Sequence, residues 1–151
     1  MPTDYEPNQQ LEQLVIEVLN GSDFNALREH EVKIASCLKI KINDDEEYVQ
    51  SPGDAAQLKK VGPPFTAFID HHFILVFDAY SWNNFPQRRS AAIHKALMRI
   101  KLKISDSGDI KLGTRVPDVQ EFTATLRRYG AYNDELTALM QAAEAISQSL
   151  R

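Results

Sequence analysis

The sequence predicts an α+β fold, a small mixed sheet with a β-hairpin packed by helices. Three observations predict this class: apolar residues at helical spacing in 11–19, alternating apolar and polar residues in 32–42, and an unbroken apolar run in 73–77. Because 151 residues suit one hydrophobic core, we expect a single domain over residues 1–151.

Two helices are predicted near the start of the chain. The spacing in 11–19 predicts the first, which ends at the Asn-Gly pair that follows. Ser22 or Asp23 is expected to cap a shorter helix through Leu27, because short polar side chains accept hydrogen bonds from the free N–H groups of a first turn.

A strand and a third helix follow. The alternation in 32–42 predicts a strand with one solvated face. Residues 43–54 form an acidic loop, and Asp54 is then expected to cap a helix over 55–61, which a Gly-Pro-Pro sequence ends.

The second half begins with a buried strand, a helix and a hairpin. The run 73–77 lies between turn-prone flanks and predicts a strand buried on both faces. Pro86 suits the first turn of a helix, which carries an apolar stripe through Ile100. Alternation in 100–104, followed by SDSGD and a second apolar pair, predicts the hairpin.

Two more helices are predicted at the end of the chain. Asp118 with Glu121 resembles a capping box and begins a helix that Gly130 ends. A last helix is expected from about Asp134. The chain ends, about 1–8 and 148–151, are expected to be flexible.

Composition favours a cytoplasmic protein with no membrane segment. No apolar run approaches the ~20 residues needed to cross a bilayer, and the start MPTDYEPNQQ lacks the regions of a signal peptide. The single Cys37 cannot form an internal disulfide, so we expect a small strand residue rather than a reactive thiol.

The net charge of −4 is unevenly distributed. Residues 1–63 hold 12 acidic and 6 basic residues, whereas 64–151 hold 9 acidic and 11 basic. The stretch 88–103, called the basic stripe below, has no acid. Its candidate nucleic-acid contacts are Arg88, Arg89, Arg99, Lys101 and Lys103. The alternative is that these side chains cover the solvated faces of a helix and a hairpin.

Two further groups are candidates for a protein interface. Asp44, Asp45, Glu46 and Glu47 offer an acidic surface to a basic partner, or are simply solvated. Tyr80, Trp82 and Phe85 form either an exposed aromatic cluster or part of the core.

Three stretches, in this order of elements, resemble a known family. They are FILVFDAYSW (73–82), QRRSAAIHKAL (87–97) and RVPDVQEFTATLRRYG (115–130). Over about residues 34–130 the chain resembles the putative phage metallopeptidase family. The resemblance implies a phage or prophage source and a zincin-like domain, with 87–97 as a central, former active-site helix packed with N- and C-terminal helices.

The chain departs from the zinc motif that this resemblance implies. Family members with the full pattern carry H-E-x-x-H, in which two histidines one turn apart bind zinc and the glutamate polarises its water. The corresponding run here is HKALM, residues 94–98. Lys95 is a cation at the position of the base, the thioether of Met98 is a poor zinc ligand, and Pro117 stands where members place a third histidine.

We therefore expect no metal and no cofactor, with His94 as a packed or partly exposed helix residue. One alternative stays open: a rebuilt metal site made from His94, one of His71 and His72, and Asp118 or Asp78. Such a site would still lack the positioned glutamate.

The first functional hypothesis is a catalytically inactive, metallopeptidase-like phage accessory protein. It would bind a host or phage protein, such as a nucleic-acid-handling or defence enzyme. The alternatives are a nucleic-acid-binding protein that uses the basic stripe and a metal-dependent hydrolase with a rebuilt site. The partner and the oligomeric state stay open.

Overall fold

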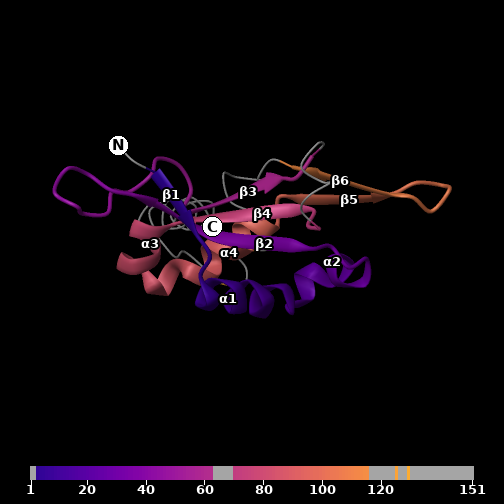
Figure 1. Ribbon diagram of the computed structural model, residues 1–151. Coiled ribbons are helices and arrows are strands. Elements are labelled where there is room, and N and C mark those ends of the chain that lie inside the picture. The colour runs from indigo at the N-terminus through magenta and orange to yellow at the C-terminus, as the bar shows by residue number, and fades with distance from the viewer. Residues whose placement is uncertain (1–2, 63–69, 116–124, 126–128, 130–151) are drawn as a thin grey trace, which may run out of the picture.

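A mixed four-stranded sheet forms the centre of the computed structural model, and a two-stranded hairpin extends beyond it (Figure 1). The structure describes residues 3–62 and 70–115 together with Thr125 and Tyr129. The strands are β1 (Thr3–Glu6), β2 (Ile34–Lys41), β3 (Ala56–Lys60), β4 (Phe73–Asp78), β5 (Ile100–Ile104) and β6 (Ile110–Thr114). The helices are α1 (Gln9–Leu19), α2 (Asn25–Glu29), α3 (Ala79–Asn84) and α4 (Arg89–Leu97), with 3-10 turns η1 (Ser22–Phe24) and η3 (Pro86–Arg88). The α+β class with a mixed sheet and a hairpin is confirmed.

The sheet has the strand order β1-β2-β4-β3, with its one parallel pair at the centre. β2 runs parallel to β4, and β1 and β3 lie antiparallel at the two edges. Because β4 is hydrogen-bonded on both sides, its side chains are almost all buried, as the apolar run predicts. Residues 32–42 supply β2, with Leu38 and Ile40 facing the core.

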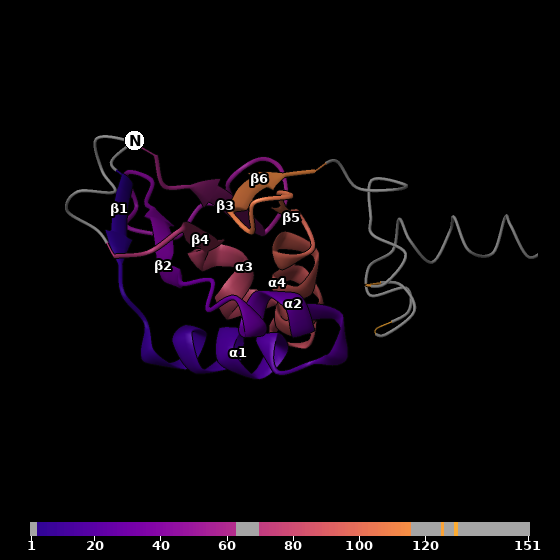
Figure 2. The same cartoon turned by 90° about the vertical axis from the view of Figure 1, so that its right-hand side faces the viewer.

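α1 forms where the helical spacing of apolar residues in 11–19 predicts a helix. The side chain of Asn8 accepts a hydrogen bond from the N–H of Leu11 at 2.9 Å, and the helix is closed by Asn20. Val15 and Val18 follow Leu11 on the buried face, which packs against β2 and α4. This arrangement places α1 beneath the sheet, alongside α4 (Figure 2).

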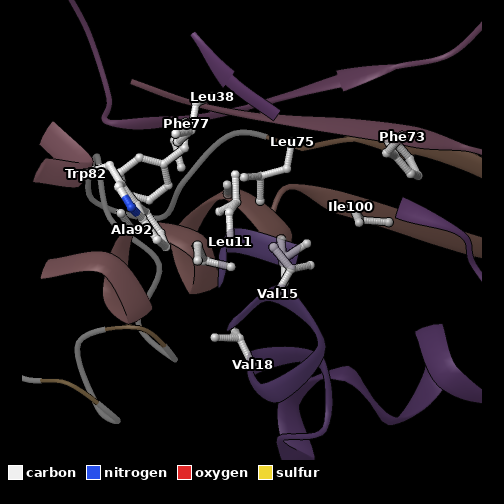
Figure 3. Close-up of a cluster of buried hydrophobic side chains, with 14 of the residues drawn as sticks. Leu11, Val15, Val18, Leu38, Phe73, Leu75, Phe77, Trp82, Ala92 and Ile100 are labelled. Carbon is white, nitrogen blue, oxygen red and sulfur yellow. The ribbon is translucent and has the colours of Figure 1, made fainter. Parts of the chain in front are cut away.

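The core lies between the sheet, α1 and α4, as Figure 3 shows. Alternate residues of β4 point into it, and they meet side chains of both helices and of α3. The labelled members are Leu11, Val15, Val18, Leu38, Phe73, Leu75, Phe77, Trp82, Ala92 and Ile100. One contiguous cluster of this kind is the expected core of a small domain.

Residues 55–61 form a strand, and the helix predicted there is wrong. Ala56–Lys60 is β3, which pairs antiparallel with β4 along its outer edge. Alanine, glutamine and lysine favour helix in isolation, but the unpaired edge of β4 offers this segment a full ladder of backbone hydrogen bonds. Asp54 caps no helix; its carboxylate instead binds Lys95.

Two elements lie outside the sequence prediction. Thr3–Glu6 pairs with β2 as the edge strand β1, where the sequence analysis placed a flexible start. Ala79–Asn84 forms the short helix α3, which Asp78 caps. The Asp78 carboxylate accepts hydrogen bonds from the N–H and the hydroxyl of Ser81, at 3.2 and 3.0 Å.

The second predicted helix is present, but its predicted cap is wrong. It forms as η1 followed by α2, and the residue at its start is Gly21, with no side-chain hydrogen bond to the first turn. Neither Ser22 nor Asp23 acts as the cap. The carboxylate of Asp23 reaches His94, 71 residues further along the chain.

Of the two C-terminal helices predicted from Asp118 and from about Asp134, the described residues include Thr125 and Tyr129 of the first, which are both helical, and the second helix and the chain end 148–151 lie outside them. Among the helices that the structure describes, none is both long and apolar enough to cross a membrane.

Candidate functional site

His94 is the most enclosed polar side chain of α4. The helix is buried from Ala91 to Leu97, and His94 keeps 1% of its surface exposed. Pro86 begins the turn that leads into the helix, as predicted. Because a buried imidazole needs partners for both ring nitrogens, the contacts of His94 define what this position can do.

Both ring nitrogens of His94 contact protein side chains. Nε2 lies 2.9 Å from Oδ2 of Asp23, and Nδ1 lies 2.5 Å from Oγ1 of Thr125. An ionised carboxylate only accepts, so Nε2 carries a proton and donates it to Asp23. The hydroxyl of Thr125 can donate or accept, so its contact is possible for a neutral and for a charged ring.

Two aromatic rings flank the imidazole. Phe24 and Tyr129 lie edge-on to it, with ring centroids 5.1 and 5.4 Å away. His94 therefore joins three segments that are distant in sequence: the η1 turn through Asp23 and Phe24, its own helix, and the helical residues Thr125 and Tyr129. Such a side chain is packed and not partly exposed, which decides between the two alternatives that the sequence left open.

Lys95 and Arg99 share one carboxylate. The ammonium of Lys95 lies 3.0 Å from Oδ1 of Asp54, and the guanidinium of Arg99 lies 3.4 Å from Oδ2. The Lys95 side chain is 10% exposed and that of Asp54 is 39% exposed. The pair therefore connects α4 to the loop before β3 at the edge of the core.

Met98 closes α4 and lines an open pocket of about 200 Å³. The pocket is bounded by α2, the end of α4 and β5, with Phe24, Leu97 and Ile100 among its lining residues. Asp23 also borders it, but the carboxylate of Asp23 is bound to His94. The surroundings of Met98 suit a thioether and offer no set of metal donors.

Of the residues of the alternative, rebuilt metal site, those that the structure describes outside α4 are His71, His72 and Asp78, and they are not brought together. His71 is exposed, and Nδ1 of His72 accepts a hydrogen bond from the N–H of Lys33 at 2.9 Å. His72 precedes β4 whereas Asp78 ends it, so a strand of six residues, about 20 Å, separates them. Asp118 lies outside the described residues. Within residues 3–62 and 70–115, Thr125 and Tyr129, no three His, Cys, Asp or Glu side chains are placed to hold a metal ion.

The zinc that the resemblance implies does not fit the residues present here. His94 offers no ring nitrogen that is clear of other side chains, because Asp23 and Thr125 each occupy one. Lys95 would bring a positive charge to the metal, and the thioether of Met98 is a poor zinc ligand. Pro117, the remaining position, lies outside the described residues. We therefore derive no catalytic step through a metal.

The basic stripe does not form one surface. Arg89 is stacked on Trp82 at 4.0 Å and donates two hydrogen bonds to the carbonyl of that residue. Arg88 lies 4.5 Å over the ring of Phe85, and Arg99 is paired with Asp54. The hairpin, which carries Lys101 and Lys103, and α3 lie at opposite ends of the molecule (Figure 1).

The candidate protein-interaction residues divide into two groups. Asp44, Asp45, Glu46 and Glu47 are all exposed in a loop that the side chain of Asn43 organises, by accepting from two of their N–H groups at 2.9 and 3.0 Å. Trp82 is 4% exposed and packs edge-on against Phe77, so it is a core residue. Tyr80 is half-buried and contacts the ring of Phe85.

Cys37 is a half-buried residue of β2, in the strand that the alternation predicts. Burial raises the pKa of its thiol, and the ammonium of Lys59 partly offsets this effect. A thiol with a raised pKa is mostly protonated and unreactive at neutral pH.

The sequence analysis missed three residues that hold this site: Asp23, Asp54 and Thr125. Asp23 and Asp54 were expected to cap helices, and nothing in local spacing connects either to α4. Thr125 is different, because it stands three residues after Phe122 and four before Tyr129. A hydroxyl on an apolar helix face indicates a buried polar partner, so this contact could have been anticipated.

The site lies inside the span of a known family. A family model described as putative phage metallopeptidase matches residues 3–144, more of the chain than the 34–130 that the resemblance covers. No curated protein and no solved structure matches the chain. The match extends over nearly the whole sequence, including α4, Asp23 and Thr125. The chain therefore belongs to the putative phage metallopeptidase family.

Proposed function

We propose that this chain is a family member without peptidase activity, which acts by binding another protein. The observation that carries the proposal is that both ring nitrogens of His94 are engaged by Asp23 and Thr125. A histidine that ligates zinc gives one ring nitrogen to the metal. Here that would break one of the two hydrogen bonds of the imidazole, and the family's other ligand and base positions hold Met98 and Lys95.

The chemistry at the base position gives further support. A metallopeptidase needs a carboxylate beside the zinc to take a proton from the attacking water. The side chain here is an ammonium that has no lone pair, and it is paired with Asp54 at 3.0 Å. A general base would have to come from a different part of the chain.

Metal analysis tests the loss of catalysis. Protein purified without a histidine tag and desalted is expected to hold less than about a tenth of an equivalent of zinc, since true sites bind with ~10–16 kcal/mol. Its urea midpoint should be the same with and without EDTA, and it should not cleave casein or a peptide library. About one equivalent of zinc retained after desalting, with cleavage that EDTA abolishes, would sink the proposal.

Affinity capture tests the binding role, and the acidic loop is the first surface to examine. We expect immobilised protein to retain a host or phage protein from lysate in the presence of nuclease. Replacing Asp44, Asp45, Glu46 and Glu47 by their amides should weaken that retention, because it removes four exposed charges from one loop.

A matched control carries the same charge change elsewhere. It replaces the exposed Glu12, Glu17, Glu29 and Glu31 by glutamine and should retain the protein normally. Retention that disappears with nuclease treatment, or no retention at all, would count against a protein partner.

A further inference from the structure

The hairpin of β5 and β6 presents a row of lysines that the sequence alone does not show. In its register Lys103 lies directly opposite Lys111, and Lys101 lies opposite Gly113. Cross-strand partners share a face, and residues two apart on one strand share it too. Lys101, Lys103 and Lys111 therefore lie on one face, and all three are exposed.

These three lysines have no carboxylate partner within the described residues. The ion pairs found among the described residues involve other cations, namely Lys33, His94, Lys95 and Arg99. Like charges directly opposite one another destabilise a strand pair, so the Lys103–Lys111 pair lowers hairpin stability in the isolated protein. An anion bound across the face would remove that repulsion.

The other charged groups of the hairpin lie at its two ends. Asp106 and Asp109 are in the turn at the tip, where Asp109 accepts a hydrogen bond from Ser107 at 3.1 Å. Arg115 follows β6, and its Nε donates to the carbonyl of Met98 at 2.7 Å. The apolar residues of β5 and β6 alternate with the lysines and point to the opposite side.

We propose that this lysine face binds the phosphates of a nucleic-acid duplex, with the hairpin acting as an arm. The hairpin extends beyond the body of the protein (Figure 1), and a two-stranded ribbon fits the major groove of B-form DNA. Lys101 and Lys103 are about 6.8 Å apart along their strand, a spacing that lets each reach a different phosphate. Lysine is depleted at protein interfaces, so three lysines in a row favour phosphate over a protein surface.

Salt-dependent binding tests this proposal, which stands apart from the proposed protein partner. A fluorescent duplex of mixed sequence is titrated with protein between about 50 and about 200 mM salt. Three phosphate contacts predict a slope of about −2.7 in log affinity against log salt, or about a 40-fold loss over that range. Binding should not depend on the base sequence, because phosphates carry none.

Two triple variants locate the surface. Replacing Lys101, Lys103 and Lys111 by glutamine should abolish binding at low salt, and each single replacement should reduce the slope by about one. The matched control replaces Lys33, Lys39 and Lys41, which lie on or beside β2, and should bind normally. Urea unfolding of all variants confirms that each is folded.

Four results would overturn the proposal: no binding at low salt, equal loss in both triple variants, tighter binding to the single strand than to the duplex, or equal binding to polyglutamate of the same charge. Each of these results is measured by titration of the purified protein against a nucleic acid or polyglutamate of known length. If the protein does not bind the duplex, the capture of a protein partner in the presence of nuclease can still succeed. The two proposals can therefore fail separately.

Discussion

Replacing His94 by alanine is expected to destabilise the protein by about 3–5 kcal/mol. The hydrogen bond to the Asp23 carboxylate contributes roughly 1.5–3 kcal/mol, and its loss leaves a partly buried charge without this partner. Removing the ring also opens a cavity between Phe24 and Tyr129, because both contact the imidazole edge-on. Since small domains are stable by ~5–15 kcal/mol, this is a large fraction of the total.

Urea unfolding followed by tryptophan fluorescence measures this effect, since Trp82 is buried. The control is His71→Ala, which removes an exposed histidine and should change stability by less than about 0.5 kcal/mol. If the alanine variant does not fold, Asp23→Asn and Thr125→Val each remove one side of the network and should cost about 1–3 kcal/mol. A midpoint for His94→Ala that matches the wild type would show that the network contributes nothing.

The same experiment separates a packing role from a metal role. If His94 acted by holding zinc, EDTA would lower the midpoint of the wild type as much as the substitution does. We expect the substitution to act and EDTA to have no effect, because the contacts of His94 are with Asp23, Thr125 and two aromatic rings.

The spacing of apolar residues was enough to predict the strands that have a buried face. The apolar run of β4 and the alternation of β2 appear where predicted, since each strand has a face that only apolar side chains can fill. β3 and β1 were missed for the opposite reason. Their side chains are mostly exposed, so the edges of β4 and β2 decide their conformation and the residues themselves do not.

The contacts of the site were harder to predict, because they are non-local. Asp23 is 71 residues from His94, and Asp54 is 41 residues from Lys95. Each aspartate also stands at a position that suits a helix cap, and that local interpretation hid its tertiary partner. The residue types themselves could be interpreted without the fold. A lysine and a methionine at two positions of a zinc motif do not supply the usual zinc ligands, whatever the helix packs against.

Lys95→Glu is expected to destabilise the protein by about 2–4 kcal/mol, although it introduces the residue type that an H-E-x-x-H motif has at this position. The new carboxylate would replace an ammonium that lies 3.0 Å from Asp54, so attraction becomes repulsion in a place where the side chain is 10% exposed. Asp54 is 39% exposed, and solvent there keeps the effect below that of a fully buried pair.

Two further variants separate charge from shape in that prediction. Lys95→Met keeps most of the stem and removes the charge, so its loss should be smaller than that of Lys95→Glu. Adding Asp54→Asn to Lys95→Glu removes the repulsion and should recover about half of the lost stability, measured as the interaction term of a double-mutant cycle. An unchanged stability for Lys95→Glu, or no recovery in the double variant, would contradict the pairing. If both results hold, a stable protein with glutamate at position 95 needs a substitution of Asp54 as well. The reason is that the loop before β3 is held to α4 by the contact between Asp54 and the positive charge of Lys95.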